Sequence, residues 1–334
     1  MKPIYLTFLS GVDIEALALE DTEILSAVEA ALSAQGNGAT VVEPRVHLIP
    51  DRSVHGHFNV LRGYIGAPIN QAGVKIVGDY VDNYKLDLPS ELGILALFDP
   101  ATGMPRALIE ASSLTDMRTG AMSAIGARYL ARRGSRILGH IGARGTAYWN
   151  VRLLDRLFDF REIRVHSRRA ESREPFAARL SRDLGKPVIA VPSWEAAVAE
   201  ADIVVEAARL EQPAPLLKTE WIKRGALVIP YGTMSAVELS LTDIMSKVVV
   251  DDWGQCRSGP FGALRAHVES GKLNQAGVHA ELGEIVAGRK CGRERADETI
   301  LFWHRGLSIT DVALGHLLLE KAQRRDVGQR LRLA

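Results

Sequence analysis

The sequence predicts an α/β protein in which a doubly wound parallel sheet is joined to a second lobe of α+β structure. Its 334 residues are too many for one ordinary core and suit two domains. Between residues 135 and 252, short β-rich runs alternate with amphipathic segments, which is typical of parallel strands joined by covering helices. Residues 1–115 instead contain a helical segment and several extended runs separated by turn signals.

The amino-acid composition indicates which classes of partner this chain has. The 41 basic and 40 acidic side chains nearly cancel, so we expect neither nucleic acid nor an anionic membrane as a partner. There are two cysteines, Cys256 and Cys291, and neither a secretory signal nor a run of about 18 apolar residues. These features favour a cytoplasmic protein without a metal site that acts on a small molecule.

The α+β lobe is expected to contain a helix at residues 22–34 and a β-hairpin. The hairpin pairs residues 93–98 with residues 104–111 around a turn that contains Pro100 and Gly103. Residues 114–133 look helical, with Gly134 as the C-terminal cap, and should bridge the two lobes. A C-terminal helix at residues 309–324 has no sheet of its own to cover and should pack back on the first lobe.

The parallel sheet is predicted from six apolar runs, which suit strands that are buried on both faces. They are residues 136–141, 162–167, 187–191, 202–207, 226–231 and 247–251. Two of the helices between them show one apolar stripe each, formed by Trp149, Leu153 and Leu157 and by Phe176, Leu180 and Leu184. We therefore divide the chain into an α+β lobe, residues 1–119 with 306–334, and a parallel-sheet lobe, residues 120–305.

A glycine-rich turn follows the first predicted parallel strand and opens a helix, as a Rossmann-type dinucleotide fingerprint requires. Gly142 takes the first glycine position and Ala147 the third. The second position is Arg144, with Gly145 and then Thr146 beside it, so the arginine must turn outward or pair with phosphate. A plain strand-to-helix turn is the alternative, but the six-strand context favours cofactor binding.

The end of the second parallel strand bears on which cofactor binds. Enzymes that use NAD usually place Asp or Glu there for the ribose 2′-hydroxyl, whereas this chain has His166, Ser167, Arg168 and Arg169. A 2′-phosphate would suit these side chains, so NADP(H) is preferred and NAD(H) remains possible. A solvated basic turn without a ligand is the other interpretation.

Four segments together resemble the ornithine cyclodeaminase/μ-crystallin family, and the resemblance extends over about residues 12–328. The segments are LFDPATGMPRA at residues 97–107, LTDMRTGA at 114–121, ADIVV at 201–205 and AELGEIVAG at 280–288. The resemblance implies a homodimerising lobe joined to a Rossmann lobe. It also implies an activity on small amino or imino acids, because the family includes cyclodeaminases, alanine dehydrogenases and imine reductases.

The resemblance assigns a cationic substrate pocket to Arg45, Lys75 and Arg118 and places Thr119 beside the cofactor phosphates. We expect the arginines to orient an α-carboxylate and Lys75 to protonate or polarise a reacting imine or carbonyl. Without the resemblance, Arg45 and Lys75 would read as side chains at strand edges. The cofactor-binding set comprises Thr119, Gly142, Arg144, Gly145, Thr146, Ala147, Ser167, Arg168, Arg169, Gly232 and Thr233.

Three positions depart from the family pattern. Thr233 follows Gly232 where cyclodeaminases and some dehydrogenases carry an aspartate, so classical cyclodeamination of ornithine is doubtful. Glu206 stands where a small or hydroxyl residue is usual, and His304 stands where serine is common. Either is a candidate replacement proton donor, and His304 is also a candidate substrate contact. The alternatives are a surface ion pair of Glu206 with Arg209 and a cofactor-facing or packing role for His304.

The leading hypothesis is an oxidoreductase that reduces a small α-imino acid with hydride from NAD(P)H, or catalyses the reverse oxidation. An ornithine-type cyclodeaminase and a non-catalytic, μ-crystallin-like protein that binds NADPH and an effector are the alternatives. His55, His57 and Arg62 lie on a segment that could flank the pocket and hint at a polar substrate, although strand-surface positions explain them as well.

Overall fold

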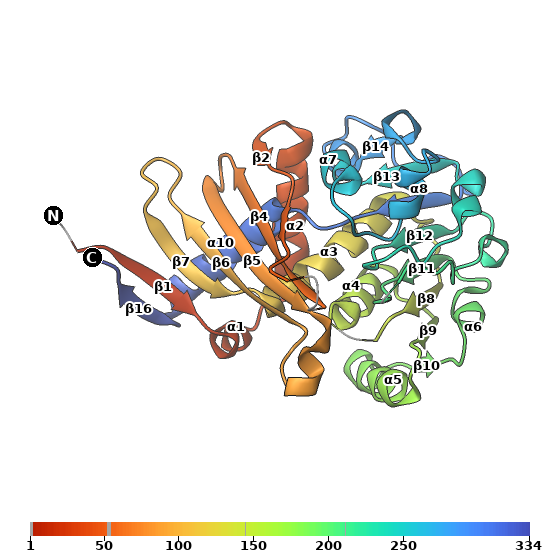
Figure 1. Ribbon diagram of the computed structural model, residues 1–334, viewed down its shortest axis with the longest axis horizontal. Coiled ribbons are helices and arrows are strands. Elements are labelled where there is room, and N and C mark those ends of the chain that lie inside the picture. Colours follow the sequence, from red (N-terminus) through yellow and green to blue (C-terminus); the bar gives the residue numbers. More distant parts are fainter. Residues whose placement is uncertain (1–2, 52–54, 144, 211) are drawn as a thin grey trace. The chain divides into compact units, whose positions relative to one another are not determined.

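The computed structural model describes residues 3–51, 55–143, 145–210 and 212–334. The chain forms two compact units (Figure 1). Unit 1 comprises Met1–Arg118 and Leu307–Ala334, and unit 2 comprises Thr119–Gly306. The division falls within one helix, α3 (Ser112–Leu130).

Unit 1 is built on a mixed sheet that contains eight strands among the described residues. Their order is β16 (Gln329–Arg332), β1 (Tyr5–Leu9), β7 (Pro105–Glu110), β6 (Glu91–Phe98), β5 (Gln71–Tyr80), β4 (Gly56–Ile65) and β2 (Thr40–Val42), and β3 (Val46–Leu48) also pairs with β4. The antiparallel pairing of β6 with β7 confirms the predicted hairpin. Figure 1 shows β16 beside β1 at one edge of this sheet.

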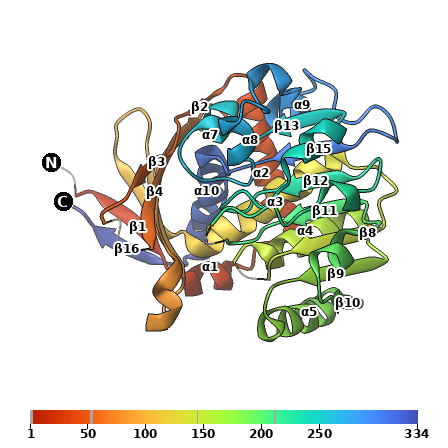
Figure 2. The same ribbon diagram turned by 45° about the vertical axis from the view of Figure 1, so that its right-hand side comes forward.

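Helices cover one face of this sheet. They are α2 (Asp21–Gly36) and α10 (Ser308–Arg325), which pack on each other, and α10 also packs on β4, β5 and β6 (Figure 2). Alternation along β5 explains the arrangement, because Lys75 and Val77 are buried whereas Ile76 is exposed. The prediction that the C-terminal helix packs back on the first lobe is confirmed. A short helix α1 (Gly11–Leu17) and a 3-10 helix η1 (Val81–Leu86) complete the unit.

Unit 2 contains a parallel sheet, which confirms the predicted doubly wound α/β class. Its order is β10 (Val188–Ala190), β9 (Glu162–His166), β8 (Ile137–Ile141), β11 (Ile203–Glu206), β12 (Leu227–Pro230), β15 (Ile300–Trp303), β13 (Lys247–Val250) and β14 (Ala280–Glu281). The chain runs outward in one direction from β8 and in the other from β11. The boundary between β8 and β11 is therefore the topological switch point of the sheet.

The prediction of six strands in this sheet was too low. Two strands were not predicted: β14, which has two residues, and β15, which has four. β15 lies between β12 and β13, although it follows both in the chain. Both strands lie beyond residues 135–252, where the alternating pattern occurs, and β15 is defined by its pairing with β12 and β13.

The helices of unit 2 lie between the strands in sequence. They are α4 (Ala147–Phe158), α5 (Ala170–Leu184), α6 (Trp194–Val198), α7 (Trp253–Arg257), α8 (Arg265–Glu269) and α9 (Leu282–Val286), with 3-10 helices η2 (Thr219–Trp221), η3 (Leu239–Ile244) and η4 (Gln275–Gly277). The first two contain the predicted apolar stripes. No helix among the described residues combines the length and apolar character needed to cross a lipid bilayer.

One predicted helix end was wrong. α3 ends at Leu130, and Gly134 lies beyond it without the left-handed backbone of a C-terminal cap. The Arg293 side chain instead donates from Nε to the carbonyl oxygen of Leu130 at 2.7 Å. A cation from a distant segment therefore satisfies the end of the helix, which the local sequence does not reveal.

Candidate active site

Three elements of unit 1 bring a buried cluster of charged side chains together. Lys75 lies on β5, Thr115 and Arg118 lie on α3, and Asp311 lies in the first turn of α10. Lys75 Nζ donates to Asp311 Oδ1 at 2.6 Å and to Thr115 Oγ1 at 3.0 Å. Arg118 Nε donates to the same Asp311 oxygen at 2.8 Å. The sequence analysis had named Lys75 and Arg118 but not their shared partner.

Burial makes this cluster unusual. Lys75 is 2% exposed, Arg118 6% and Asp311 0%. Burying charge is costly unless it is paired, and here two cations share one carboxylate. The three groups have one positive charge in excess, which matches the single negative charge of an α-carboxylate.

A sequence signal for Asp311 does exist. Leu314 and Leu318 follow it at i+3 and i+7, so the aspartate lies on the apolar stripe of α10 and all three are buried. A carboxylate on the core-facing stripe of a helix requires a buried partner. Asp311 is not among the site residues predicted from the sequence, because the C-terminal helix was expected only to pack on the first lobe.

Burial and neighbouring cations lower the pKa of Lys75 to about 8 from an ordinary value of 10.5. Desolvation is the largest cause and the positive charge of Arg118 the next, while Asp311 opposes both by stabilising the ammonium. Arg45, half-buried between β2 and β3, adds a smaller effect in the same direction as Arg118. The three predicted cations therefore interact electrostatically, and Lys75 titrates near neutral pH.

The other polar residues that had been considered for the substrate pocket are placed differently. His57 lies opposite Asp79 in the β4–β5 pairing, on the face of the sheet that contains Lys75. Arg62 lies on the opposite face and approaches Glu43 at 3.5 Å. His55 is exposed and pairs with Asp82 at 3.1 Å. Of the three, only His57 shares the face of the cationic cluster.

In unit 2, the glycine turn lies at the switch point of the parallel sheet. Gly142 follows β8 with a φ of +115°, and a Cβ atom there would lie 2.8 Å from the Ala207 carbonyl oxygen. Gly145 also has a positive φ, +53°. The turn therefore requires glycine at both positions. α4 starts immediately afterwards at Ala147, with Thr146 as its N-cap. Arg144 lies outside the described residues.

The turn is held by buried polar contacts. His140 Nδ1 lies 3.0 Å from the Gly142 carbonyl oxygen, and burial lowers the pKa of His140 to about 4. The imidazole is therefore neutral at physiological pH and donates from Nδ1 to that oxygen. On the other side, Thr146 Oγ1 lies 2.7 Å from the Tyr231 hydroxyl, which also accepts a hydrogen bond from Asn150 at 2.8 Å.

His304 belongs to this part of unit 2. It follows β15, is 1% exposed, and places Nε2 2.9 Å from the Ser123 hydroxyl. Its ring stacks on Tyr231 with centroids 4.8 Å apart. The histidine thus supports the tyrosine that contacts Thr146. Thr119, the first residue of unit 2, lies on α3 and is buried.

The end of β9 is basic, as the sequence indicated. Arg168 and Arg169 are exposed and Ser167 is half-buried, whereas the preceding His166 is buried and places Nδ1 2.9 Å from the Val191 carbonyl oxygen. Arg173 on α5 donates to the Ser167 carbonyl oxygen at 3.2 Å. Residues 166–170 contain no carboxylate, so the position that usually selects a 2′-hydroxyl has positive charge instead.

Glu206 is not a surface carboxylate, so the alternative interpretation of a surface ion pair with Arg209 was wrong. It ends β11, between Ile141 on β8 and Pro230 on β12, and is fully buried. Oε1 accepts from the Ala208 amide at 2.7 Å, while Oε2 has no partner among the described residues. Burial raises the pKa of Glu206 to about 8. A Cβ atom on Gly232 would lie 2.7 Å from both carboxyl oxygens.

Thr233, which departs from the family pattern, follows Gly232 after β12 and is half-buried. Its carbonyl oxygen accepts from the Gly262 amide at 2.8 Å. A hydroxyl therefore stands where cyclodeaminases of the family that this sequence resembles carry a carboxylate. A threonine hydroxyl has no pKa near neutrality and cannot exchange a proton with ammonia as a carboxylate can.

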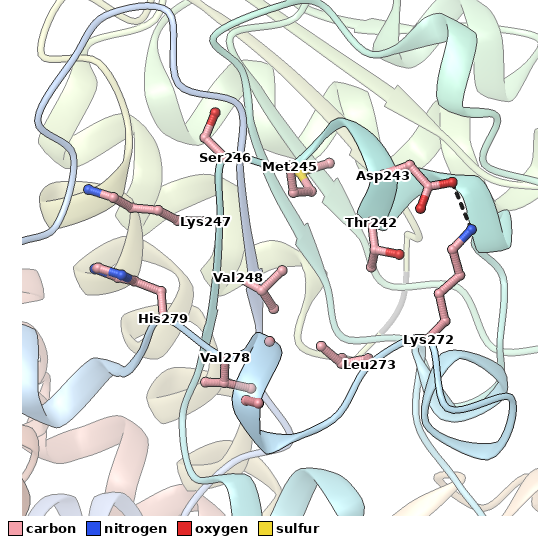
Figure 3. A pocket seen from close by; sticks show the side chains of 12 residues that line it. Thr242, Asp243, Met245, Ser246, Lys247, Val248, Lys272, Leu273, Val278 and His279 are labelled. Carbon is pink, nitrogen blue, oxygen red and sulfur yellow. Dashed lines mark hydrogen bonds and ion pairs between the residues drawn. The ribbon is translucent and has the colours of Figure 1, made fainter.

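A separate cavity of about 270 Å³ in unit 2 lies away from this turn. Figure 3 shows Lys272 paired with Asp243 on one side of the cavity, and Lys247 and His279 on the other. Lys247 begins β13, so the cavity adjoins the amino end of a parallel strand, opposite to the edge where the glycine turn lies. Ligands of such sheets bind beyond the carboxyl ends, so this cavity is not the dinucleotide site.

The described residues fit a dinucleotide. A positive-φ glycine at the switch point brings the backbone close, the amides of the first turn of α4 are oriented for a pyrophosphate, and a basic strand end follows. Among the described residues, no group of three or more His, Cys, Asp or Glu side chains is arranged to hold a metal ion.

The fold and these sites define a two-unit protein with a Rossmann-type dinucleotide-binding unit and a unit that contains a buried lysine and arginine pair. Residues 6–326 match the ornithine cyclodeaminase/mu-crystallin family, and the chain belongs to this family. It is 30% identical over 327 residues to the alanine dehydrogenase of Archaeoglobus fulgidus, and the aligned region covers 97% of each chain.

Two solved structures are closely similar. One is Thermococcus litoralis Δ1-pyrroline-2-carboxylate reductase in complex with NADH and L-proline, with a TM-score of 0.90 and 31% identity over 98% of this chain and 100% of that one. The other is an archaeal alanine dehydrogenase dimer with bound NAD, with a TM-score of 0.91 and 29% identity over 99% of this chain and 100% of that one. The named relatives are thus oxidoreductases of amino and imino acids.

Proposed function

We propose that this protein is an NAD(P)H-dependent reductase of a small α-imino acid, which also catalyses the reverse oxidation of the amino acid. The observation that carries the proposal is the buried Lys75 beside Arg118, with one positive charge in excess after pairing with Asp311. Such a cluster suits a small anion with a reacting nitrogen. Relatives that reduce pyrroline-2-carboxylate or dehydrogenate alanine support the same chemistry.

The residues of unit 1 bind and protonate the substrate in this proposal. Arg118 and Arg45 pair with the α-carboxylate, because guanidinium groups match its two oxygens. Lys75, with its pKa near 8, donates a proton to the imine nitrogen and accepts it in the reverse direction. A reduced nicotinamide, when bound, would supply the hydride for the imine carbon. One reduced cofactor is consumed for each imine bond reduced.

A spectrophotometric screen tests the proposal. NADPH and NADH oxidation is followed with glyoxylate, pyruvate, oxaloacetate and cyclic imines, and the keto acids are supplied with and without ammonia or methylamine. We expect oxidation only when an imine is present or can form. Cofactor binding without turnover on the whole panel would instead support a non-catalytic binding protein.

For the cofactor, we propose a preference for NADP(H). The support is the exposed Arg168 and Arg169 at the end of β9, together with the lack of a carboxylate there. NADPH should therefore bind more tightly than NADH in a titration of cofactor fluorescence. Arg168→Ala should weaken NADPH binding and leave NADH nearly unchanged. Equal affinities for the two cofactors in the wild-type protein would contradict this preference.

We further propose that the enzyme does not cyclise ornithine. Thr233 replaces the carboxylate that would manage ammonia loss, while the cations for the α-carboxylate are present. Ornithine with catalytic NAD should therefore yield no proline. Proline formed without net cofactor consumption would overturn the reductase assignment in favour of a cyclodeaminase.

Finally, we propose that the protein is a homodimer that pairs through the uncovered face of the unit 1 sheet. Helices cover one face, whereas five apolar side chains on the other are about half exposed: Val46, Leu48, Ile76, Leu92 and Ile94. The register places Val46, Val60, Ile76 and Ile94 in one row across four strands. An apolar face of this kind favours a second copy of the same surface.

A further inference from the structure

We propose that Asp311 is a positioning residue that holds Lys75 in its proton-donating form and fixes it beside Arg118. This inference rests on the proposed function, because it assigns how the donor of that reaction is maintained. In the sequence, Asp311 lies more than 200 residues from Lys75 and somewhat fewer from Arg118. Its Oδ1 atom nevertheless accepts hydrogen bonds from both side chains, at 2.6 and 2.8 Å. Asp311 itself is fully buried and contacts no solvent.

The geometry separates this role from an ordinary ion pair. Both donors bind Oδ1, while Oδ2 is buried and has no partner among the described residues. Asp202 of unit 2 also binds two cations through Oδ1, but its Oδ2 accepts from the Arg136 and Ile137 amides and so ties the carboxylate to the backbone. Among the described residues, the Asp311 side chain instead accepts only from Lys75 and Arg118, and it sets the ammonium and the guanidinium side by side around one point.

Among the described groups around Lys75, Asp311 is the one that stabilises the positive charge of the ammonium. On the neighbouring strands, Lys75 lies opposite Leu61 of β4 and Leu95 of β6, which are apolar. On the covering helices it faces Thr115 and Arg118 of α3 and Asp311 of α10. Arg45 lies nearby and is also positive. Burial and both arginines lower the pKa of Lys75, and Asp311 raises it.

Without this carboxylate, Lys75 would lose its proton at a lower pH than in the wild type. Removing an opposite charge in direct contact shifts a pKa by about 1–3 units. In Asp311→Asn, which keeps an oxygen at the same place without the charge, the pKa of Lys75 should therefore fall from about 8 to between about 5 and 7. Reduction of an imine would then lose its proton donor in the physiological range.

Two measurements test this on the full chain. The chain has ten lysines, so NMR spectra of ¹³C-labelled lysine side chains can be followed against pH, with the Lys75 signal assigned by its loss in Lys75→Met. The second measurement is the pH profile of kcat for imine reduction. In Asp311→Asn, both the Lys75 titration and the alkaline limb of kcat should move to lower pH by about 1–3 units. Asp311→Glu, which restores the charge, should move them back toward the wild-type values.

Asp202→Asn is a matched control. Asp202 is a mostly buried carboxylate in unit 2 that pairs with Arg132 and Lys223 and does not contact Lys75. Its loss should lower stability without moving the Lys75 titration. An Asp311→Asn variant that is folded and titrates at Lys75 as the wild type does would overturn the proposal. A shifted NMR titration in a protein that reduces no imine would leave Asp311's role intact and refute only the proposed function.

If Asp311→Asn does not fold, the triple variant Lys75→Met/Arg118→Met/Asp311→Asn decides the matter. It removes both buried cations together with their shared partner, so the proposal expects it to recover folding. Failure of the triple variant to fold as well would mean that Asp311 serves α10 itself and not the two cations, which contradicts the proposal.

Discussion

At the scale of single residues, Lys75 is the side chain on which the proposed chemistry depends. Lys75→Met should lower kcat for imine reduction by roughly 10²–10⁴-fold, as the loss of a general acid does. The wild-type rate should decline above pH 8, because the pKa of Lys75 is about 8 and the neutral amine has no proton to donate. Steady-state kinetics between pH 6 and 10 would measure both effects. Lys272→Met, which removes a surface lysine paired with Asp243, should leave the rate unchanged.

Arg118 is expected to act differently from Lys75. Arg118→Ala should raise KM for the substrate by about 10- to 100-fold, because a charge-assisted bond to the α-carboxylate is lost. Its effect on kcat should be smaller than that of Lys75→Met. A large loss of kcat with an unchanged KM would show that Arg118 does not bind the carboxylate.

Glu206 should make stability depend on pH. Its folded-state pKa, about 8, lies above the value of about 4.5 for an unburied carboxyl. Between these values the folded protein retains a proton that the unfolded chain releases, so the free energy of unfolding falls as pH rises. Glu206→Gln mimics the protonated form and should be more stable than the wild type at pH 8. The pKa shift between the unfolded and folded states limits the gain to about a few kcal/mol. At pH 4 the two should agree. Urea unfolding at both pH values would show whether they do.

At the scale of elements, the turn after β8 should tolerate no side chain at Gly142. Alanine there would have an unfavourable positive φ and a Cβ atom 2.8 Å from the Ala207 carbonyl oxygen. Gly142→Ala should therefore displace the turn and weaken NADPH binding at least about tenfold, which corresponds to about 1.4 kcal/mol. Fluorescence titration measures this loss.

Gly103 provides the control for backbone strain. It also has a positive φ, +70°, but nothing lies within 4 Å of a Cβ atom at that position. Gly103→Ala should lower stability by about 1 kcal/mol without affecting cofactor binding. Equal effects of the two substitutions on binding would mean that Gly142 acts through general stability and not through the turn.

An element could be predicted from the sequence where local pattern defines it, and could not where distant partners define it. Strands such as β8 and β11 are nearly continuous apolar runs, and α4 has a stripe of period 3.6, so local pattern sufficed for them. β15 and the end of α3 depend on partners far away in the chain, and no local signal marked them. In the site, the family resemblance pointed to Lys75 and Arg118. The apolar stripe of α10 indicates that Asp311 is buried, but only the fold shows that it contacts both cations.

At the scale of the whole molecule, the exposed apolar face of the unit 1 sheet should determine the oligomeric state. Light scattering at micromolar concentration should give the mass of two chains. Ile94→Glu places a charge in the row that contains Ile76 and should produce monomers, because an unpaired carboxylate in an apolar interface is costly. Val12→Glu, which changes an exposed residue on α1, should leave the mass unchanged. A monomeric wild-type protein would refute the proposed dimer.

The discontinuity of unit 1 affects how the chain acquires its structure during synthesis. Unit 2 is one continuous segment, whereas the strands of unit 1 must wait for α10, which begins about 200 residues after β7 ends. At about 5–20 residues per second, a ribosome needs about 10–40 s to supply that helix. Until then, the helix-covered face of the sheet lacks α10, and Lys75 lacks Asp311 as its counter-ion. The nascent first unit therefore has a period in which chaperones can bind it, and Lys75 acquires its counter-ion only after unit 2 has been synthesised.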